Sequence, residues 1–279
     1  MRVINSRVIT DEVKRLCMEA AVYLGEDVKS CIRERIETEE SETGKNILSI
    51  LLENARKAEE TKTPICQDTG MAVFFVKVGQ DVVVEGETIT EAINRGVSEG
   101  YTEGYLRKSV VSPIDRINTQ DNTPAVIHYD FVKGDKIEIE FAAKGFGSEN
   151  MSALKMLKPS DGVEGIKKFV VETVSNAGPN PCPPTVIGVG IGGTMDKCCQ
   201  IAKKALFREL GKHSDDEFTA NLEKEILEEI NKLGIGPQGF GGSTTSFAVH
   251  IETYPTHIAG LPVAVNVNCH ASRHKSTVI

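Results

Sequence analysis

The chain has 279 residues, 40% of them hydrophobic, and its 32 Lys and Arg against 40 Asp and Glu give a net charge of −8. This length and composition suit a globular protein with one large hydrophobic core or two modest ones. The acidic balance excludes a general attraction to nucleic acid or anionic membranes, although one local basic pocket could still hold a small carboxylate or phosphate.

The N-terminal sequence lacks the apolar segment of a signal peptide, and no apolar run reaches the roughly 18 residues of a membrane span. We therefore expect a cytoplasmic protein that has neither a membrane nor a nucleic acid as a partner. Thiols stay reduced in that compartment. The seven cysteines are accordingly expected to be core residues, metal ligands or nucleophiles rather than disulfides.

Helical periodicity dominates the N-terminal region, 1–60. Apolar residues recur at offsets of three and four within Val13–Leu24 and again within Val28–Ile36. Cys17 and Cys31 occupy these apolar positions. A free cysteine behaves as a small hydrophobic residue, so both are expected in the core.

The rest of the chain alternates between predicted strands and helices. Two helices are predicted at Ser160–Ala177 and Ser214–Leu233, and a third opens at the core positions Cys198 and Cys199. The pattern predicts a mixed α/β (α+β) fold, in which the helical N-terminal region precedes a mixed β-sheet packed with helices. No linker or internal repeat is visible, so a single domain is expected over 1–279. The strands are predicted at Ala72–Val78, Val126–Val132, Lys136–Ala142, Val186–Gly190, Phe247–Glu252 and Val263–Asn268.

Three further cysteines lie outside the helical patterns. Cys66, Cys182 and Cys269 each stand where a predicted strand meets a loop rich in Pro, Gly or Asn. Their long separations are unlike the short C-x₂-C pairs of a zinc ribbon. Three thiolates from separate loops suit an iron–sulfur cluster that keeps one iron free of protein ligands. The residues alone leave two interpretations open, such a cluster or three unrelated loop cysteines.

Two short motifs favour other functions at first sight. Gly188–Gly193 satisfies the G-x-G-x-x-G pattern of dinucleotide-binding proteins, but the required strand with an acidic residue about 20 positions further on is missing. The sequence "DTG" at Asp68 is that of aspartic proteases, whose dyad needs two such aspartates. The chain has one copy, so neither motif carries a function by itself.

Several loops add candidate binding residues. Gly145 and Gly147 lie in "AKGFGSENMS", which suits either a nest of backbone donors for an anion or a turn with a helix cap. Arg107 lies in a segment broken by Pro and Asn, where it is either a surface residue or an anion ligand. His257 precedes the last predicted strand, and a loop histidine of this kind is either structural or catalytic.

Seven segments in order resemble the α subunit of class I fumarate hydratase and of its relative L-tartrate dehydratase. The resemblance runs from about Thr10 to Arg273. It is carried by "PICQDTG", "LRKSVV", "NTQDNTPA", "KGFGSEN", "GPNPCPPTVIGVGIGGT", "GPQGFGGSTT" and "YPTHIAGLPVAVNVNCHASR".

The resemblance implies an oxygen-sensitive [4Fe-4S] cluster held by Cys66, Cys182 and Cys269, with the fourth iron open to the substrate. These are the same three cysteines that stand at loop ends. The glycines of Gly188–Gly193 would then allow the backbone to approach the cluster closely. A nucleotide-binding role for them is not expected.

The same resemblance assigns roles to the residues around the cluster. Asp68 would handle the proton of the arriving or departing hydroxyl group, and His257 would line the catalytic pocket. Arg107 would pair with a substrate carboxylate through its bidentate guanidinium group. The substrate-binding residues implied in this way are Gln67, Arg107, Gly145 and Gly147.

The implied enzyme is a hydro-lyase that adds water to a C4 dicarboxylate or removes it, with fumarate and L-malate as the first expected pair and tartrate next. The swivelling domain of single-chain members has no counterpart after Ile279, so a separate β subunit and an αβ hetero-oligomer are expected. Contacts from the β chain would help to choose among malate, tartrate and a methylated analogue. Two alternatives remain, a nicotinamide-dependent oxidoreductase and an iron–sulfur protein for electron transfer or sensing.

Overall fold

The computed structural model describes residues 1–279, and they group into two compact units. The sequence predicts one domain over this range, whereas each unit here has a hydrophobic core of its own. The units interleave along the chain, so segments far apart in sequence share a core. Unit 1 comprises Met1–Leu24, Ala55–Phe146 and Arg273–Ile279, and unit 2 comprises Gly25–Asn54 and Gly147–Ser272.

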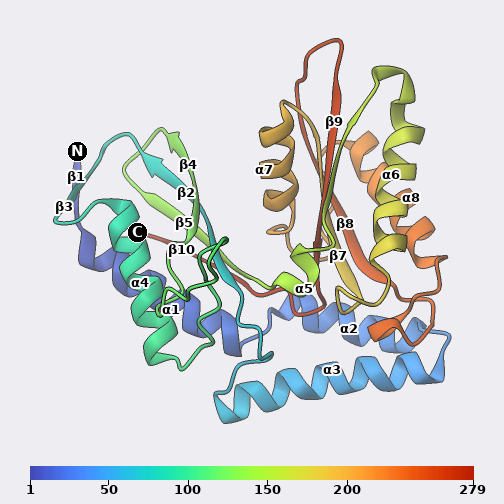
Figure 1. The fold of residues 1–279 in the computed structure, drawn as a ribbon, viewed down its shortest axis with the longest axis horizontal. Helices are drawn as coiled ribbons and strands as arrows, with labels where there is room; N and C mark the ends of the chain where they lie inside the picture. The colour runs from blue at the N-terminus through green and yellow to red at the C-terminus, as the bar shows by residue number, and fades with distance from the viewer. The chain divides into compact units, whose positions relative to one another are not determined.

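Unit 1 contains a four-stranded sheet, a two-stranded sheet and two long helices (Figure 1). Its elements are β1 (Arg2–Asn5), α1 (Ser6–Val22), β2 (Met71–Gly79), β3 (Val82–Glu85), α4 (Ile89–Glu103), β4 (Val126–Val132), β5 (Ile137–Lys144) and β10 (His274–Val278). The larger sheet has the order β10-β5-β2-β4, and only β2 and β4 are parallel. In the smaller sheet β1 pairs with β3 in parallel.

The helices of unit 1 start at side-chain caps and pack on one face of the larger sheet. Asn5 accepts the backbone N–H of Arg7 at 2.9 Å, and Thr88 forms a capping box with Glu91. The helices approach closely at Gly96, where a Cβ would lie 2.6 Å from the carbonyl oxygen of Thr10. The buried faces of α1 and α4 form one core with alternate residues of β2 and β5.

Unit 2 contains the second four-stranded sheet and most of the remaining helices (Figure 1). Its elements are α2 (Glu26–Thr38), β6 (Ala153–Leu157), η1 (Pro159–Asp161), α6 (Gly162–Ala177), β7 (Thr185–Gly192), α7 (Met195–Ala205), α8 (Glu217–Asn231), η2 (Pro237–Gly239), β8 (Ser246–Tyr254) and β9 (Leu261–Asn268). Two helices, α3 (Glu42–Thr61) and α5 (Phe146–Glu149), have residues in both units.

The sheet of unit 2 has helices on both faces. Its order is β6-β9-β7-β8, with β7 and β8 parallel and the other pairs antiparallel. The helices α6 and α8 cover one face with Val, Ile and Leu side chains, and α7 covers the other (Figure 1). On the α7 face β7 carries Gly188 and Gly190. A Cβ at these positions would lie 2.2 Å from the Ala202 carbonyl oxygen and 2.0 Å from that of Cys198, so only glycine lets α7 sit this close.

The mixed α/β fold is confirmed, and the six predicted strands correspond to β2, β4, β5, β7, β8 and β9. The helices predicted over Ser160–Ala177 and Ser214–Leu233 correspond to η1 with α6 and to α8. The sequence analysis did not predict β1, β3, β6, β10 or α4. Apart from α4 these elements have four or five residues, too few to show a clear period. No helix in the structure has both the length and the apolar character needed to cross a membrane.

A buried carboxylate explains the glycine-rich segment "GGSTT" of unit 2. Glu39 is 2% exposed and accepts the backbone N–H groups of Ser41 (2.9 Å), Ser243 (2.8 Å) and Thr244 (2.8 Å). At Gly242 a Cβ would lie 2.5 Å from the Glu39 carboxylate. Burial by itself raises the pKa of Glu39, but hydrogen bonds from Thr244, Ser41 and Ser243 outweigh it and hold the pKa below its ordinary value.

We expect Glu39→Gln to lower the free energy of unfolding by about 1–3 kcal/mol at neutral pH, because the amide nitrogen cannot accept an N–H. The folded pKa of Glu39 is lowered, so its contribution is present above the unfolded pKa and is lost as the pH falls through the folded value. Urea unfolding at neutral and acidic pH should show the difference shrinking in acid. The neighbouring Glu40 is exposed, and Glu40→Gln should leave stability unchanged at both pH values.

Candidate active site

The loop that joins α3 to β2 carries three of the predicted site residues. Cys66 and Asp68 are partly exposed there, and Gln67 is exposed. The following residues Thr69 and Gly70 are buried, and Gly70 has a φ of 78°. The buried end of the loop therefore anchors it to unit 1, while its polar side chains stay accessible to a ligand.

Two backbone N–H groups fix the carboxylate of Asp68. Its Oδ1 accepts from Gly70 at 2.9 Å, and its Oδ2 accepts from Phe146 at 2.9 Å. At Gly145 a Cβ would lie 3.1 Å from Oδ2, so glycine leaves room for this carboxylate. The N–H group of Phe146, which follows this turn, thus binds Asp68 of the same unit. The substrate contacts expected for Gly145 and Gly147 stay a prediction.

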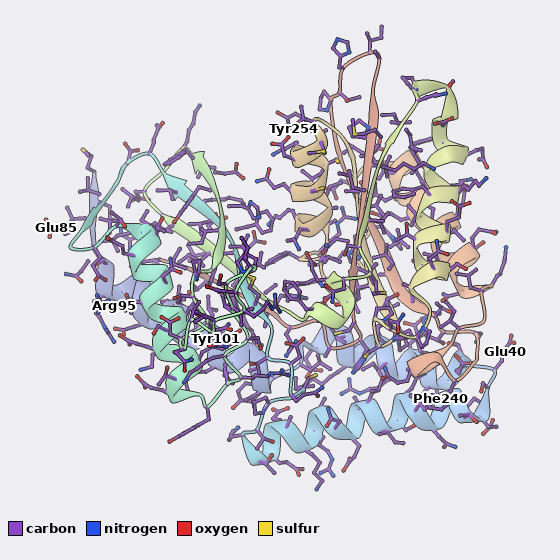
Figure 2. All side chains as sticks on the ribbon, viewed as in Figure 1. Glu40, Glu85, Arg95, Tyr101, Phe240 and Tyr254 are labelled. Atoms are coloured by element: carbon purple, nitrogen blue, oxygen red, sulfur yellow. The ribbon has the colours of Figure 1, made fainter.

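The main chain after Asp68 is held by buried side chains. Tyr101, which projects from α4 (Figure 2), points its hydroxyl at the carbonyl oxygens of Thr69 (2.8 Å) and Gly70 (3.1 Å). Burial raises the pKa of Tyr101, so its hydroxyl stays protonated and can donate. Arg273 Nη1 donates to the carbonyl oxygen of Asp68 at 2.7 Å.

Arg107 lies next to this loop and is exposed. Its carbonyl oxygen accepts the hydroxyl of Thr69 at 3.0 Å. The buried Asn122 links the same two segments, since its Nδ2 donates to the Gly70 carbonyl (3.2 Å) and its Oδ1 accepts the N–H groups of Ser109 (2.7 Å) and Val110 (3.2 Å). Unit 1 therefore brings together residues from "PICQDTG", "LRKSVV" and "NTQDNTPA".

The other two predicted ligands meet at one end of the sheet of unit 2. Cys182 precedes β7 and Cys269 follows β9, and these strands pair antiparallel with Val186 opposite Asn268. The carbonyl oxygen of Cys182 accepts the backbone N–H of His270 at 3.4 Å. Cys182 is exposed and Cys269 is partly exposed, so both thiols are accessible.

The remaining cysteines have different surroundings. Burial raises the pKa of Cys17, and it raises the pKa of Cys31 and Cys198 to about 11. A metal ligand must be a thiolate, so a thiol held protonated in this way is a poor ligand. The core positions predicted for Cys17 and Cys198 are confirmed, Cys31 is partly buried, and Cys199 is exposed on α7 instead of lying in the core.

The structure places His257 far from the cysteines of its own unit. It lies in the exposed loop between β8 and β9, whereas Cys182 and Cys269 lie at the opposite end of the same strands. The eight residues of β9 span about 26 Å. The catalytic role that the resemblance implies for His257, as a residue lining the pocket, stays a prediction.

The structure explains the glycine at position 192, but it gives no reason for the glycine at position 147. A Cβ at Gly147 would meet only the carbonyl oxygen of Asn180 at 3.7 Å, so nothing in unit 2 requires glycine there. A Cβ at Gly192 would lie 1.9 Å from the carbonyl oxygen of Tyr254, which stands at the end of β8 beside α7 (Figure 2). The backbone that Gly188–Gly193 approaches is therefore the protein's own, which explains the motif without a nucleotide or a cluster.

The chemistry of the donors decides whether an iron–sulfur cluster fits. No group of three or more His, Cys, Asp or Glu side chains in the structure is arranged to hold a single metal ion. A [4Fe-4S] cluster takes one thiolate for each iron that it anchors to the protein, so its ligands need not surround one point. None of the seven cysteines forms a disulfide, and Cys66, Cys182 and Cys269 are exposed or partly exposed on loops at strand ends. Each of these three cysteines therefore has the chemistry and the exposure that a ligand of such a cluster needs.

The sequence analysis missed the residues that support the loop. Thr69, Tyr101, Asn122 and Arg273 form its hydrogen-bonded frame, and all but Thr69 come from segments distant in sequence. Three of them lie inside or at the edge of the segments that carry the family resemblance. In the sequence these four residues show only as polar residues beside apolar ones. That pattern is too common to identify them until their contacts are known.

Comparisons with known proteins agree with the sequence resemblance. A family model described as fumarate hydratase (fumerase) matches residues 10–278. A Methanocaldococcus jannaschii protein provisionally named L(+)-tartrate dehydratase subunit alpha is 49% identical over 271 residues, which cover 95% of each chain. The L(+)-tartrate dehydratase subunit alpha of Escherichia coli O157:H7 is 34% identical over 275 residues, 97% of this chain and 90% of that protein. The chain therefore belongs to the fumarate hydratase family of hydro-lyases.

Proposed function

We propose that this chain is the α subunit of a [4Fe-4S] hydro-lyase that interconverts fumarate and L-malate by adding or removing water. The match over residues 10–278 carries the reaction class. The hydrogen bond between the Cys66–Gly70 loop and the backbone of Arg107 supports it, because it joins a loop with a thiol, a carboxylate and an amide to a segment that carries a cationic residue. A C4 dicarboxylate needs a cation for its charge and a proton-transfer group for its hydroxyl.

Asp68 would take up a proton from the attacking water or return it to the departing hydroxyl group. Each of its oxygens accepts one backbone N–H, which fixes the plane of the carboxylate and leaves one further lone pair on each oxygen. The side chain is partly exposed, so a ligand can reach those lone pairs. A group that is fixed before the substrate arrives loses no rotational freedom in the proton transfer.

Arg107 and Gln67 would bind and orient the substrate. Both side chains are exposed, and Thr69 ties their segments together through the Arg107 carbonyl oxygen. A guanidinium group matches a carboxylate with two parallel hydrogen bonds. The amide of Gln67 can donate to a carboxylate oxygen or accept from the substrate hydroxyl, which would set the register of the substrate beside Asp68.

We propose Cys66, Cys182 and Cys269 as the three ligands of the cluster. When bound, the cluster would supply a Lewis-acidic iron that weakens the C–O bond of the substrate hydroxyl. The support for this set is the exposure of the three cysteines on loops at strand ends, together with their place in the part of the chain that the family model matches.

L-tartrate is the second candidate substrate, because curated relatives with 33% to 49% identity are named as tartrate dehydratase subunits. Loss of water from tartrate uses the same functions, namely carboxylate binding and proton transfer at a hydroxyl group. The relatives are named as alpha subunits, which supports a separate β chain that completes the active site in an αβ hetero-oligomer. The cytoplasmic location expected from the sequence stays a prediction.

Anaerobic reconstitution with the β chain tests the proposal. The α chain alone is expected to be inactive and to lose its visible absorbance quickly in air, and added β chain should restore turnover and slow the bleaching. Fumarate hydration and L-tartrate dehydration, measured on the same preparation, decide between the two substrates. Full turnover by α alone would contradict the split site. Binding of β with no turnover of either acid would contradict the hydro-lyase assignment.

A further inference from the structure

Arg273 is a buried cation without an acidic partner. Its residue is 3% exposed, its Nε has no hydrogen-bond partner, and no carboxylate forms an ion pair with its guanidinium group. The one hydrogen bond of its side chain runs from Nη1 to the carbonyl oxygen of Asp68, at 2.7 Å. A buried arginine is normally paired with an acid, because removing the charge from water is unfavourable. The burial of Arg273 therefore needs an explanation, and its side-chain contact with the Asp68 loop suggests one.

The backbone of Arg273 is held by the strand β5. Its carbonyl oxygen accepts the N–H of Ala143 at 3.1 Å, and β10 begins at the next residue, where His274 pairs with Ala142. The strand β5 continues from Ala143 to the turn at Gly145. A Cβ at Gly145 would lie 3.5 Å from Arg273 Nη2 and 3.1 Å from Asp68 Oδ2, so all three groups meet at this turn.

We propose that Arg273 is a positioning residue for Asp68, an inference that rests on the proposed hydro-lyase function. Its hydrogen bond fixes the peptide plane between Asp68 and Thr69. That plane sets the direction in which the Asp68 carboxylate leaves the chain, toward the N–H groups of Gly70 and Phe146.

The mechanism requires this support because the Cys66–Gly70 loop has no regular secondary structure of its own. Tyr101 and Asn122 hold the carbonyl oxygens of Thr69 and Gly70, so they fix the end of the loop next to β2. Arg273 is the group that holds the carbonyl oxygen of Asp68 itself. Without it the carboxylate could rotate away from a productive position while the rest of the loop stayed in place.

The variants Arg273→Met and Arg273→Lys test the proposal in the reconstituted αβ enzyme. Methionine keeps much of the side-chain length and removes the charge and the donors, and lysine keeps the charge with a donor. We expect the methionine variant to lower kcat by about 10²-fold with KM changed less than about 2-fold, since misplacement of a reacting group by about 1 Å has this effect. The lysine variant should recover most of kcat. Ile139→Val, in the core of unit 1, is the control for lowered stability and should keep kcat.

Hydrogen exchange on the purified α chain gives a readout that does not depend on activity. In the methionine variant the amides of Gly70 and Phe146, which donate to Asp68, should exchange faster than in the wild type. The amide of Phe141 inside β5 should be unchanged, whereas general loss of stability would speed all three. Unchanged exchange at Gly70 and Phe146, or an unchanged kcat in an active enzyme, would overturn the role of Arg273. If the wild-type enzyme turns over neither acid, the proposed function fails, and the exchange rates still decide whether Arg273 positions Asp68.

Discussion

Asp68→Asn is expected to lower kcat of the reconstituted enzyme by about 10²–10⁴-fold while the cluster and the fold remain. An amide cannot take up a proton at neutral pH, so the proton-transfer function is lost although the size of the side chain is kept. The amide oxygen can still accept the N–H of Gly70, but the amide nitrogen cannot accept that of Phe146. One unpaired donor costs about 1–3 kcal/mol, less than the stability of a typical domain.

The measurement is steady-state turnover of fumarate and L-tartrate, with iron content and thermal stability determined on the same samples. Asp216→Asn is a matched control, because Asp216 also accepts a backbone N–H, from Thr219 at 2.9 Å, but caps α8 in unit 2. It should keep wild-type kcat. Near wild-type turnover of the Asp68 variant with an intact cluster would remove Asp68 from the mechanism.

Serine substitution at Cys66, Cys182 or Cys269 is expected to abolish retention of the cluster in each case. The hydroxyl of serine has a much higher pKa than a thiol, so it does not provide the anionic ligand that an iron needs. Three ligands already leave one iron without a protein ligand, and a cluster held by two thiolates would be weakly bound. Anaerobic analysis of iron and sulfide in the purified variants measures the loss.

The other four cysteines serve as controls of the same chemical change. Cys199→Ser is the closest match for Cys182, because both thiols are exposed in unit 2. It should keep its iron, and so should Cys31→Ser. Serine at the buried positions Cys17 and Cys198 is expected to lower stability rather than iron content. Full iron in any one of the three ligand variants would refute the ligand set.

Much of the secondary structure follows from the sequence because it depends on local patterns. The strand β2 is a run of β-branched and aromatic residues that follows a turn, and α8 repeats Leu and Ile at helical spacing. The strand β10 was not predicted, because "HKSTV" is short and polar and becomes a strand only by pairing with β5. Its tertiary partner outweighs its weak intrinsic preference.

The sequence also singled out the residues that we propose for the chemistry, because residue type and loop position are local properties. Cys66 and Asp68 stand out as a thiol and a carboxylate beside a turn, and the segment that holds them belongs to a matched family. In contrast, the sequence did not show at which end of the sheet the loop of His257 lies. The direction of β8 and β9 decides the end of the sheet at which that loop lies, and strand direction is a property of the whole sheet.

What only the tertiary structure decided is the frame that holds Asp68. Arg273 is 205 residues from Asp68 in sequence, and Asn122 is 52 residues from Gly70. No local pattern predicts such pairs, because a hydrogen bond between distant residues depends on how the strands β2, β5 and β10 line up. The same holds for Gly188 and Gly190, which read as a nucleotide motif in sequence and serve close packing of α7 on β7. The sequence determined which groups are available for the reaction, and the packing of distant segments determined which of them are held in place and by what.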